Sequence, residues 1–309
     1  MRIVSLLPSA TEIVCALGLA DQLVGITHEC DFPAEVVGKR VLTRSAQPAT
    51  GATSREIHRR VTDAVHGGSS IYELDETALA ELKPDLILTQ ELCQVCAVSY
   101  REVNEAARSI AGDVTVVSLE PTSLEGIFNT ISTVGAMTSK ETRAVRLLER
   151  LRGRLGRFES RVQKRREQGY TAPRVVGLEW LDPPFAVGHW VPEQIRRAGG
   201  WDLLGSEGER SVETTWEAVR DVDPEMIVLM PCGFHLEDTV TEWARTPRPG
   251  FWTQIEAVRR GSVFAVDGSA YFSRPGPRAI DGIAMLAEIF DPNAFVDTSP
   301  AGSWTPLQS

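Results

Sequence analysis

A short sequence pattern occurs twice in this chain, and it limits the possible folds more than any other feature. Residues 79–88 and 219–228 each combine a helix end, a proline–acid turn and an apolar run. The two prolines are 140 positions apart (224 − 84). An apolar run that follows such a turn is typical of a buried strand. We therefore predict two lobes that are built alike.

Short apolar runs alternate with helical segments in both halves of the chain. This alternation is typical of an α/β fold with a mostly parallel sheet. We expect strands at residues 3–6, 22–27, 84–89, 114–118, 174–180, 226–230 and 263–266. We expect helices at residues 9–18, 54–65, 76–82, 100–110, 192–198, 214–220 and 277–290. Ser9 is predicted to cap the first helix, with Glu12 three residues later completing a capping box.

A long segment between the two halves favours a single helix. Residues 139–168 contain no proline and only two glycines, and leucines recur in them at helical spacing. About 30 helical residues would span roughly 45 Å. We interpret the many arginines and lysines here as the solvated face of this helix. The expected fold is therefore α/β, with two Rossmann-like lobes of mostly parallel sheet joined by one long helix. The expected divisions are an N-terminal lobe (1–137), the linking helix (138–169), a C-terminal lobe (170–292) and a loose tail (293–309).

Charge and hydropathy exclude several classes of protein. The 309 residues include 32 Lys and Arg against 42 Asp and Glu, a net charge of −10, which argues against a nucleic-acid partner. No apolar stretch is long enough for a membrane span. The opening residues do not form a secretory signal, so we expect a cytoplasmic location for the chain as it stands. A location in the periplasm or at the cell surface would be expected if a signal had been removed.

The ends of the predicted strands carry an unusual set of side chains. In open parallel sheets, ligands bind beyond the carboxyl ends of the strands, so two facing lobes would bring these loops to one cleft. Thiolates and imidazoles suit transition metals, and aromatic walls suit a large planar ligand. The candidate ligand-binding residues are Ser9, His28, Glu29, Cys30, Asp31, Glu91, Cys93, Cys96, Glu179, Trp180, His189, Trp190, Cys232, Phe234, Tyr271 and Phe272.

The cysteines permit more than one interpretation. Five cysteines in a chain of this size favour reduced thiols over a disulfide framework. Cys93 and Cys96 could be a thiol pair without metal, a contact to metal or ligand, or a redox disulfide. The candidate metal ligands are His28, Cys30, Cys93 and Cys96. Cys15 lies on a predicted helix and is expected in the core.

Several motifs now point to one family. The segment at residues 3–25, the proline turns at 84 and 224, and the long helix at 139–168 resemble the helical-backbone (class III) substrate-binding proteins of ABC importers. Within that family the chain is most similar to the members that bind vitamin B12 (cobalamin). The resemblance covers roughly residues 1–291, and the lysine–proline–aspartate strand with the long helix is its most specific part.

The resemblance implies a function and a set of partners. It implies two Rossmann-like lobes that hold a small-molecule ligand, and an ABC permease that receives one exposed acid from each lobe. Seven residues before each repeat proline the chain has Thr77 and Glu217, and Glu76 stands beside Thr77. Glu76 and Glu217 are therefore the candidate docking acids. A nucleic-acid partner is not expected, and the chain itself is not expected to span a membrane.

The leading hypothesis is a binding protein, and not an enzyme, for a cobalamin-like corrinoid or a related metal chelate. In it, Trp180, Trp190, Phe234 and Phe272 supply apolar area. The polar groups are assigned to His28, Glu29, Asp31 and Glu179, and either His28 or His189 is the candidate axial ligand to cobalt. One alternative is an intracellular metal-binding protein that uses the cysteines and histidines of the cleft. Another is a cysteine-dependent enzyme on the same scaffold.

Overall fold

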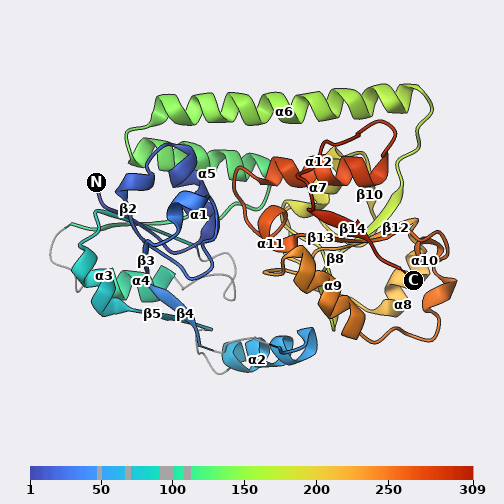
Figure 1. Cartoon of the computed structure of the whole chain (residues 1–309), viewed down its shortest axis with the longest axis horizontal. Helices are drawn as coiled ribbons and strands as arrows, with labels where there is room; N and C mark the ends of the chain where they lie inside the picture. Colours follow the sequence, from blue (N-terminus) through green and yellow to red (C-terminus); the bar gives the residue numbers. More distant parts are fainter. Residues whose placement is uncertain (47–50, 67–70, 91–99, 108–112, 309) are drawn as a thin grey trace. The chain divides into compact units, whose positions relative to one another are not determined.

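The computed structural model describes residues 1–46, 51–66, 71–90, 100–107 and 113–308. These residues form two compact units, each with a sheet of its own (Figure 1). The first unit consists of Met1–Ala52, Glu56–Pro121 and Glu125–Leu148, and the second of Thr53–Arg55, Thr122–Leu124 and Glu149–Ser309. The two-lobed α/β fold expected from the sequence is confirmed.

The sheet of the first unit has the strand order β3-β2-β1-β6-β7, and each of its described pairings is parallel. Parallel neighbours need crossover connections, which explains why helices alternate with the strands. The strands are β1 (Ile3–Ser5), β2 (Leu23–Ile26), β3 (Arg40–Val41), β6 (Leu86–Thr89) and β7 (Thr115–Ser118), and β4 (Thr43–Ser45) pairs separately and antiparallel with β5 (Tyr72–Leu74). The helices are α1 (Pro8–Ala16), α2 (Ser54–His66), α3 (Glu76–Leu82), α4 (Tyr100–Ala107) and α5 (Leu124–Met137), with 3₁₀ turns at Ala20–Gln22 and Ala34–Val36.

The start of α1 differs from the predicted capping box. The helix begins at Pro8, and Leu7 precedes it without any side-chain cap. Proline is favoured in the first helical turn because its φ is already helical and it has no N–H to satisfy. Ser9 therefore lies inside the helix, and the prediction that it caps the helix is wrong.

The sheet of the second unit has the strand order β11-β9-β8-β12-β13-β14, and β10 also pairs with β8. Its centre is parallel, whereas β9, β11 and β14 join it antiparallel. The strands are β8 (Arg174–Leu181), β9 (Pro184–Ala186), β10 (Trp201–Asp202), β11 (Val212–Glu213), β12 (Met226–Leu229), β13 (Val263–Val266) and β14 (Trp304–Pro306). The helices are α7 (Val191–Arg197), α8 (Trp216–Val222), α9 (Leu236–Arg245), α10 (Glu256–Arg259), α11 (Gly268–Tyr271) and α12 (Ala279–Phe290), with a 3₁₀ turn at Trp252–Gln254.

The internal repeat is present in three dimensions. Helices α3 and α8 both end in a left-handed residue before the repeat proline, Lys83 at φ 44° and Asp223 at φ 42°. The acid after each proline then accepts a hydrogen bond from a backbone N–H beside the neighbouring strand. Asp85 accepts from Arg2 at 2.6 Å and Glu225 accepts from Arg174 at 2.9 Å. The same local chemistry therefore aligns the central strands of both sheets.

The C-terminal residues are packed, contrary to the loose tail expected at 293–309. Phe295 is only 1% exposed, and Thr298 donates its backbone N–H to Glu288 at 2.9 Å. Strand β14 then adds to β13, where Trp304 meets Phe264 edge to face with ring centroids 5.8 Å apart. The segment is packed through single aromatic residues and one short strand. It has no long apolar run, so no pattern in the sequence indicated this packing.

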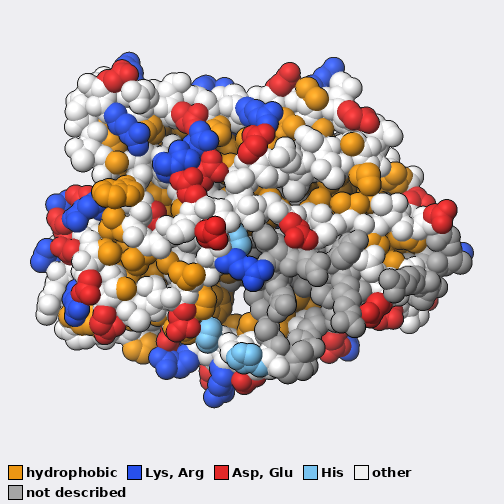
Figure 2. Space-filling model, turned by 180° about the vertical axis from the view of Figure 1, so that it is seen from behind, with side chains coloured by type: hydrophobic (Ala, Val, Ile, Leu, Met, Phe, Trp, Pro, Cys, Tyr) orange, Lys and Arg blue, Asp and Glu red, His pale blue; other side chains and the backbone are white. Residues whose placement is uncertain are grey.

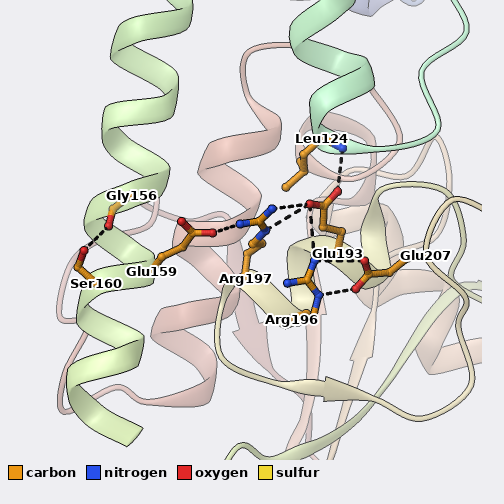
Figure 3. A network of polar contacts seen from close by, with 8 residues as sticks. All are labelled: Leu124, Gly156, Glu159, Ser160, Glu193, Arg196, Arg197 and Glu207. Atoms are coloured by element: carbon orange, nitrogen blue, oxygen red, sulfur yellow. Dashed lines mark hydrogen bonds and ion pairs between the residues drawn. The ribbon is translucent and has the colours of Figure 1, made fainter. Parts of the chain in front are cut away.

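The expected long helix is α6 (Glu141–Glu167), which is unbroken over its length (Figure 1). Its leucines at 147, 148, 151 and 155 are buried. In the second unit, Arg197 pairs with both Glu159 of α6 and Glu193 of α7, and Glu193 also accepts the backbone N–H of Leu124 at 3.0 Å (Figure 3). No helix among the described residues is both long enough and apolar enough to cross a bilayer.

Candidate functional site

The carboxyl edge of the second sheet carries a pair of partly exposed aromatic side chains. Trp180 lies near the end of β8, and Phe234 lies in the loop that follows β12, its parallel neighbour. Their ring centroids are 5.4 Å apart at an interplanar angle of 74°, an edge-to-face contact. The indole N–H of Trp180 donates to the carbonyl of Ser54 at 3.2 Å. Both residues were predicted at this edge, and the structure brings them together.

The first residues of α2 belong to this same surface of the second unit. The backbone N–H of Ser54 donates to the buried carboxylate of Glu242 at 2.6 Å. Arg55 donates two hydrogen bonds of 2.8 Å to Asp182, in the turn after β8. The Ser54 hydroxyl is buried and has no hydrogen-bond partner among the described atoms. No sequence motif marked Ser54 or Glu242, because the contact joins positions 188 residues apart.

Glu179 precedes Trp180 in β8, but it is half-buried and its carboxyl group has other partners. Its carboxyl group accepts hydrogen bonds from the Ser211 hydroxyl and the Gly188 backbone, while burial raises its pKa. His189, which follows Gly188, has a positive φ of 53°, and its backbone N–H donates to the carbonyl of Glu209 at 2.6 Å. Burial, and then the charge of Arg210, lower the pKa of His189. These contacts fix the loop at residues 205–211 against the end of β8.

Two of the predicted aromatic contacts are core residues. Trp190 is 5% exposed and Phe272 is 2% exposed, and the indole N–H of Trp190 donates to the carbonyl of Phe272 at 3.0 Å. Both side chains therefore offer almost no surface to a ligand. Tyr271 is partly exposed and lies near Arg278, and burial raises its pKa. Cys232 is exposed, and its N–H donates to the carbonyl of Glu179 at 3.0 Å.

The carboxyl end of β2 carries the candidate polar residues of the first unit. The thiol of Cys30 lies 3.1 Å from the hydroxyl of Thr11 on α1. His28 contacts Thr43 through Nδ1 at 2.8 Å, and Glu29 accepts a hydrogen bond from the Tyr72 hydroxyl at 2.9 Å. Ser9 is buried inside the first turn of α1, whereas Asp31 is exposed. The predicted group at residues 28–31 is therefore held by threonine and tyrosine hydroxyls that the sequence did not mark.

The metal-site prediction extends beyond the described residues. Glu91, Cys93 and Cys96 lie outside them, so half of the predicted metal ligands have no position here. Within the parts of the chain that the structure describes, no group of three or more His, Cys, Asp or Glu side chains is arranged to hold a metal ion. His28 and Cys30 come from the same loop but bind different threonines.

Cys15 and Cys232 are expected to differ sharply in reactivity. Burial raises the pKa of Cys15 to about 12, and it is 8% exposed, whereas Cys232 is exposed. Only the thiolate alkylates, and near pH 8 roughly one Cys15 side chain in ten thousand would be ionised. Iodoacetamide followed by peptide mass mapping should therefore modify Cys232 at least 100-fold faster than Cys15 in the native protein. In urea the two rates should converge, and equal native rates would contradict the burial of Cys15.

The two candidate docking acids both lie in the first turn of a helix, one in each unit. Glu76 is exposed in the first turn of α3, and Glu217 is exposed in the first turn of α8. Both helices have a side-chain cap: Asp75 accepts from the N–H of Ala78, and Thr215 accepts from the N–H of Ala218. Acids in the first turn of a helix also interact favourably with its dipole. Glu217 corresponds to Thr77 in the repeat, so Glu76 stands one residue before the equivalent position in the first unit.

Two α/β units of related design, each with ligand-type side chains at the carboxyl edge of its sheet, define a binding protein of the two-lobed α/β class. The chain belongs to the periplasmic binding protein family, whose sequence profile matches residues 3–270. This agrees with the family-level resemblance found in the sequence.

Individual relatives cover almost the whole chain. An uncharacterized ABC transporter substrate-binding lipoprotein, YvrC of Bacillus subtilis (strain 168), is 26% identical over 300 residues, which are 95% of this chain and 81% of YvrC. A periplasmic heme binding protein from Pseudomonas aeruginosa superimposes with a TM-score of 0.74 at 20% identity, covering 100% of this chain and 99% of that chain. The periplasmic vitamin B12 binding protein BtuF of Vibrio cholerae gives 0.67 at 19% identity, covering 94% and 96%. At these identities the solved structures establish the fold.

Proposed function

We propose that this protein is the substrate-binding component of an ABC importer and that its ligand is a cobalamin-like corrinoid or a related metal chelate. The family supports the receptor role, and YvrC is described as an ABC transporter substrate-binding lipoprotein. The similar folds that carry vitamin B12 or heme support a large planar ligand that holds a metal. In this role the protein would work outside the cytoplasmic membrane, in the periplasm or at the cell surface.

One observation carries the ligand assignment, namely the aromatic pair Trp180 and Phe234. Both side chains are partly exposed at the carboxyl edge of the second sheet, where α/β proteins bind ligands. The hydrogen bond to Ser54 fixes the indole of Trp180, so little side-chain entropy is lost when a flat ligand covers it. An apolar ring that becomes desolvated by a ligand contributes about 1.5–3 kcal/mol.

The first unit would supply polar groups and two side chains that suit a metal. We assign His28, Glu29, Cys30 and Asp31 to contacts with the polar edge of the chelate. The thiol of Cys30 and the imidazole of His28 are the side chains of this group that suit a transition metal in the ligand. Glu76 and Glu217 would then dock on basic residues of the permease.

Titration of the purified chain tests the assignment. Aquacobalamin, hemin and a ferric siderophore are each added, and binding is followed by visible absorbance and by calorimetry. The expected result is saturable binding of one of these metal chelates with one ligand per chain. Absence of binding by all three at tens of micromolar would overturn the ligand class, and selective binding of bare metal ions would replace it with a metal receptor.

A further inference from the structure

Helix α6 is strongly basic in an acidic protein. Its 27 residues contain ten Lys or Arg and four Glu, a local charge of +6, whereas the whole chain carries −10. Figure 2 shows one face of the molecule, on which basic and acidic side chains are intermixed. This is the usual arrangement on the surface of a protein in water. The charge of α6 is therefore an exception that folding alone does not explain.

The arginines on one flank of α6 have partners. Arg143 donates to the carbonyl of Leu17 at 2.8 Å. Arg154 pairs with Asp281 at 2.6 Å, and Arg165 pairs with Asp291 at 2.7 Å. Arg143 thus holds its part of the helix to the first unit, and Arg154 and Arg165 hold theirs to the second, so the three have a structural role.

Four other basic residues form a separate row, which we call the basic stripe: Arg146, Arg150, Arg157 and Lys164. All four are exposed, and the ion pairs seen among the described residues include none of them. Their spacing of four, seven and seven residues keeps them within about 40° of one another around the helix axis. The row extends over about 27 Å at 1.5 Å per residue.

Two glycines lie beside the basic stripe without a packing reason. A Cβ at Gly156 would meet nothing within 4 Å, and one at Gly153 would meet only the Arg157 guanidinium at 3.8 Å. Glycine inside an exposed helix costs about 1 kcal/mol relative to alanine. Between Arg150 and Arg157 no side chain projects from the helix at these two glycines. A flat partner can therefore come close to the charged groups of the stripe.

We propose that the basic stripe docks this protein on the surface of an anionic lipid bilayer. A straight row of one sign, all pointing the same way, suits an extended flat anion and not a small ligand. Because the rest of the chain is acidic, attraction exists only when α6 faces the lipid within about a Debye length, so docking also orients the molecule. The inference rests on the proposed function in one respect, since a receptor that serves a permease works beside a bilayer.

Cosedimentation of the full chain with vesicles tests the proposal. Vesicles of phosphatidylglycerol and phosphatidylcholine in equal parts are compared with vesicles of phosphatidylcholine alone, at low salt and without ligand. We expect binding only to the anionic vesicles, and we expect high salt to release the protein. Replacing all four stripe residues by glutamine should weaken this binding by about 30-fold or more.

A matched variant separates the stripe from general charge. Arg59, Lys83, Arg245 and Arg259 are exposed elsewhere, and changing these four to glutamine alters the net charge equally. This control should keep its vesicle binding within threefold, and both variants should bind the metal chelate as the parent chain does. Three results would overturn the proposal. They are an equal loss of vesicle binding in the two variants, equal binding of the parent chain to neutral and anionic vesicles, and a salt-sensitive dimer of the parent chain that only the stripe variant loses. Failure to bind any chelate with intact vesicle binding would instead count against the proposed function alone.

Discussion

Replacing Gly188 by alanine is expected to destabilise the second unit by about 3 kcal/mol or more. An added Cβ would lie 2.2 Å from the backbone nitrogen of Ser211 and 2.7 Å from the carbonyl oxygen of Glu209. Backbone atoms cannot turn aside as the end of a side chain can, so the loop at residues 205–211 must move away from β8. That movement would also remove the hydrogen bond that the Ser211 hydroxyl gives to the Glu179 carboxyl group.

Tryptophan fluorescence during urea unfolding measures this effect. All seven tryptophans lie between residues 180 and 304, so their emission reports the second unit. The matched control is Gly156→Ala, where a Cβ meets nothing within 4 Å. It should stabilise the protein by about 0.5–1 kcal/mol, because alanine is the better helix former. An unfolding midpoint of Gly188→Ala equal to that of the parent chain would contradict the close approach.

Trp180→Ala is expected to weaken chelate binding by about 30-fold while the fold remains intact. Removing the indole takes away one ring of the aromatic pair and leaves a gap beside Phe234. A loss of about 2 kcal/mol corresponds to a factor of roughly 30 in Kd. Trp180→Phe keeps an apolar ring and loses only the bond to Ser54, so it should recover most of the affinity.

The control for Trp180 lies on β10, which pairs with the opposite end of β8. Trp201 is 63% exposed and pairs with Arg174, the first residue of β8, whereas Trp180 lies near the last. Trp201→Ala therefore removes an equally large, more exposed ring from the edge opposite the candidate site. Calorimetric titration should give the parent Kd for Trp201→Ala. A similar loss in both variants would show that the strand-end surface does not select the ligand.

Much of the fold could be predicted because its determinants are local. The turn at Pro84 and its copy at Pro224 lie within a few residues of the strands they precede, and α6 shows its apolar stripe without any proline. The C-terminal strand could not be predicted, because Trp304 packs on Phe264, a residue 40 positions earlier (304 − 264). Helix α1 begins at Pro8, so Ser9 is not its N-cap as the sequence pattern had indicated.

The candidate site was predictable only in part. Strand-end reasoning found Trp180 and Phe234, since both follow apolar runs directly. It also selected Trp190 and Phe272, whose burial depends on how α7 packs on its neighbours, and residue type does not reveal that. Ser54 and Glu242 were missed because they meet only after the chain has folded.

The position of β14 has a consequence for how the protein is made. This strand pairs antiparallel with β13, and residues 304–306 leave the ribosome well after β13 does. The first unit can close its sheet early in synthesis, because β7 ends at Ser118. The second unit must wait with the free edge of β13 open, and such an edge can pair with other nascent chains. Slow translation of the segment between β13 and β14 should therefore favour aggregation of this protein.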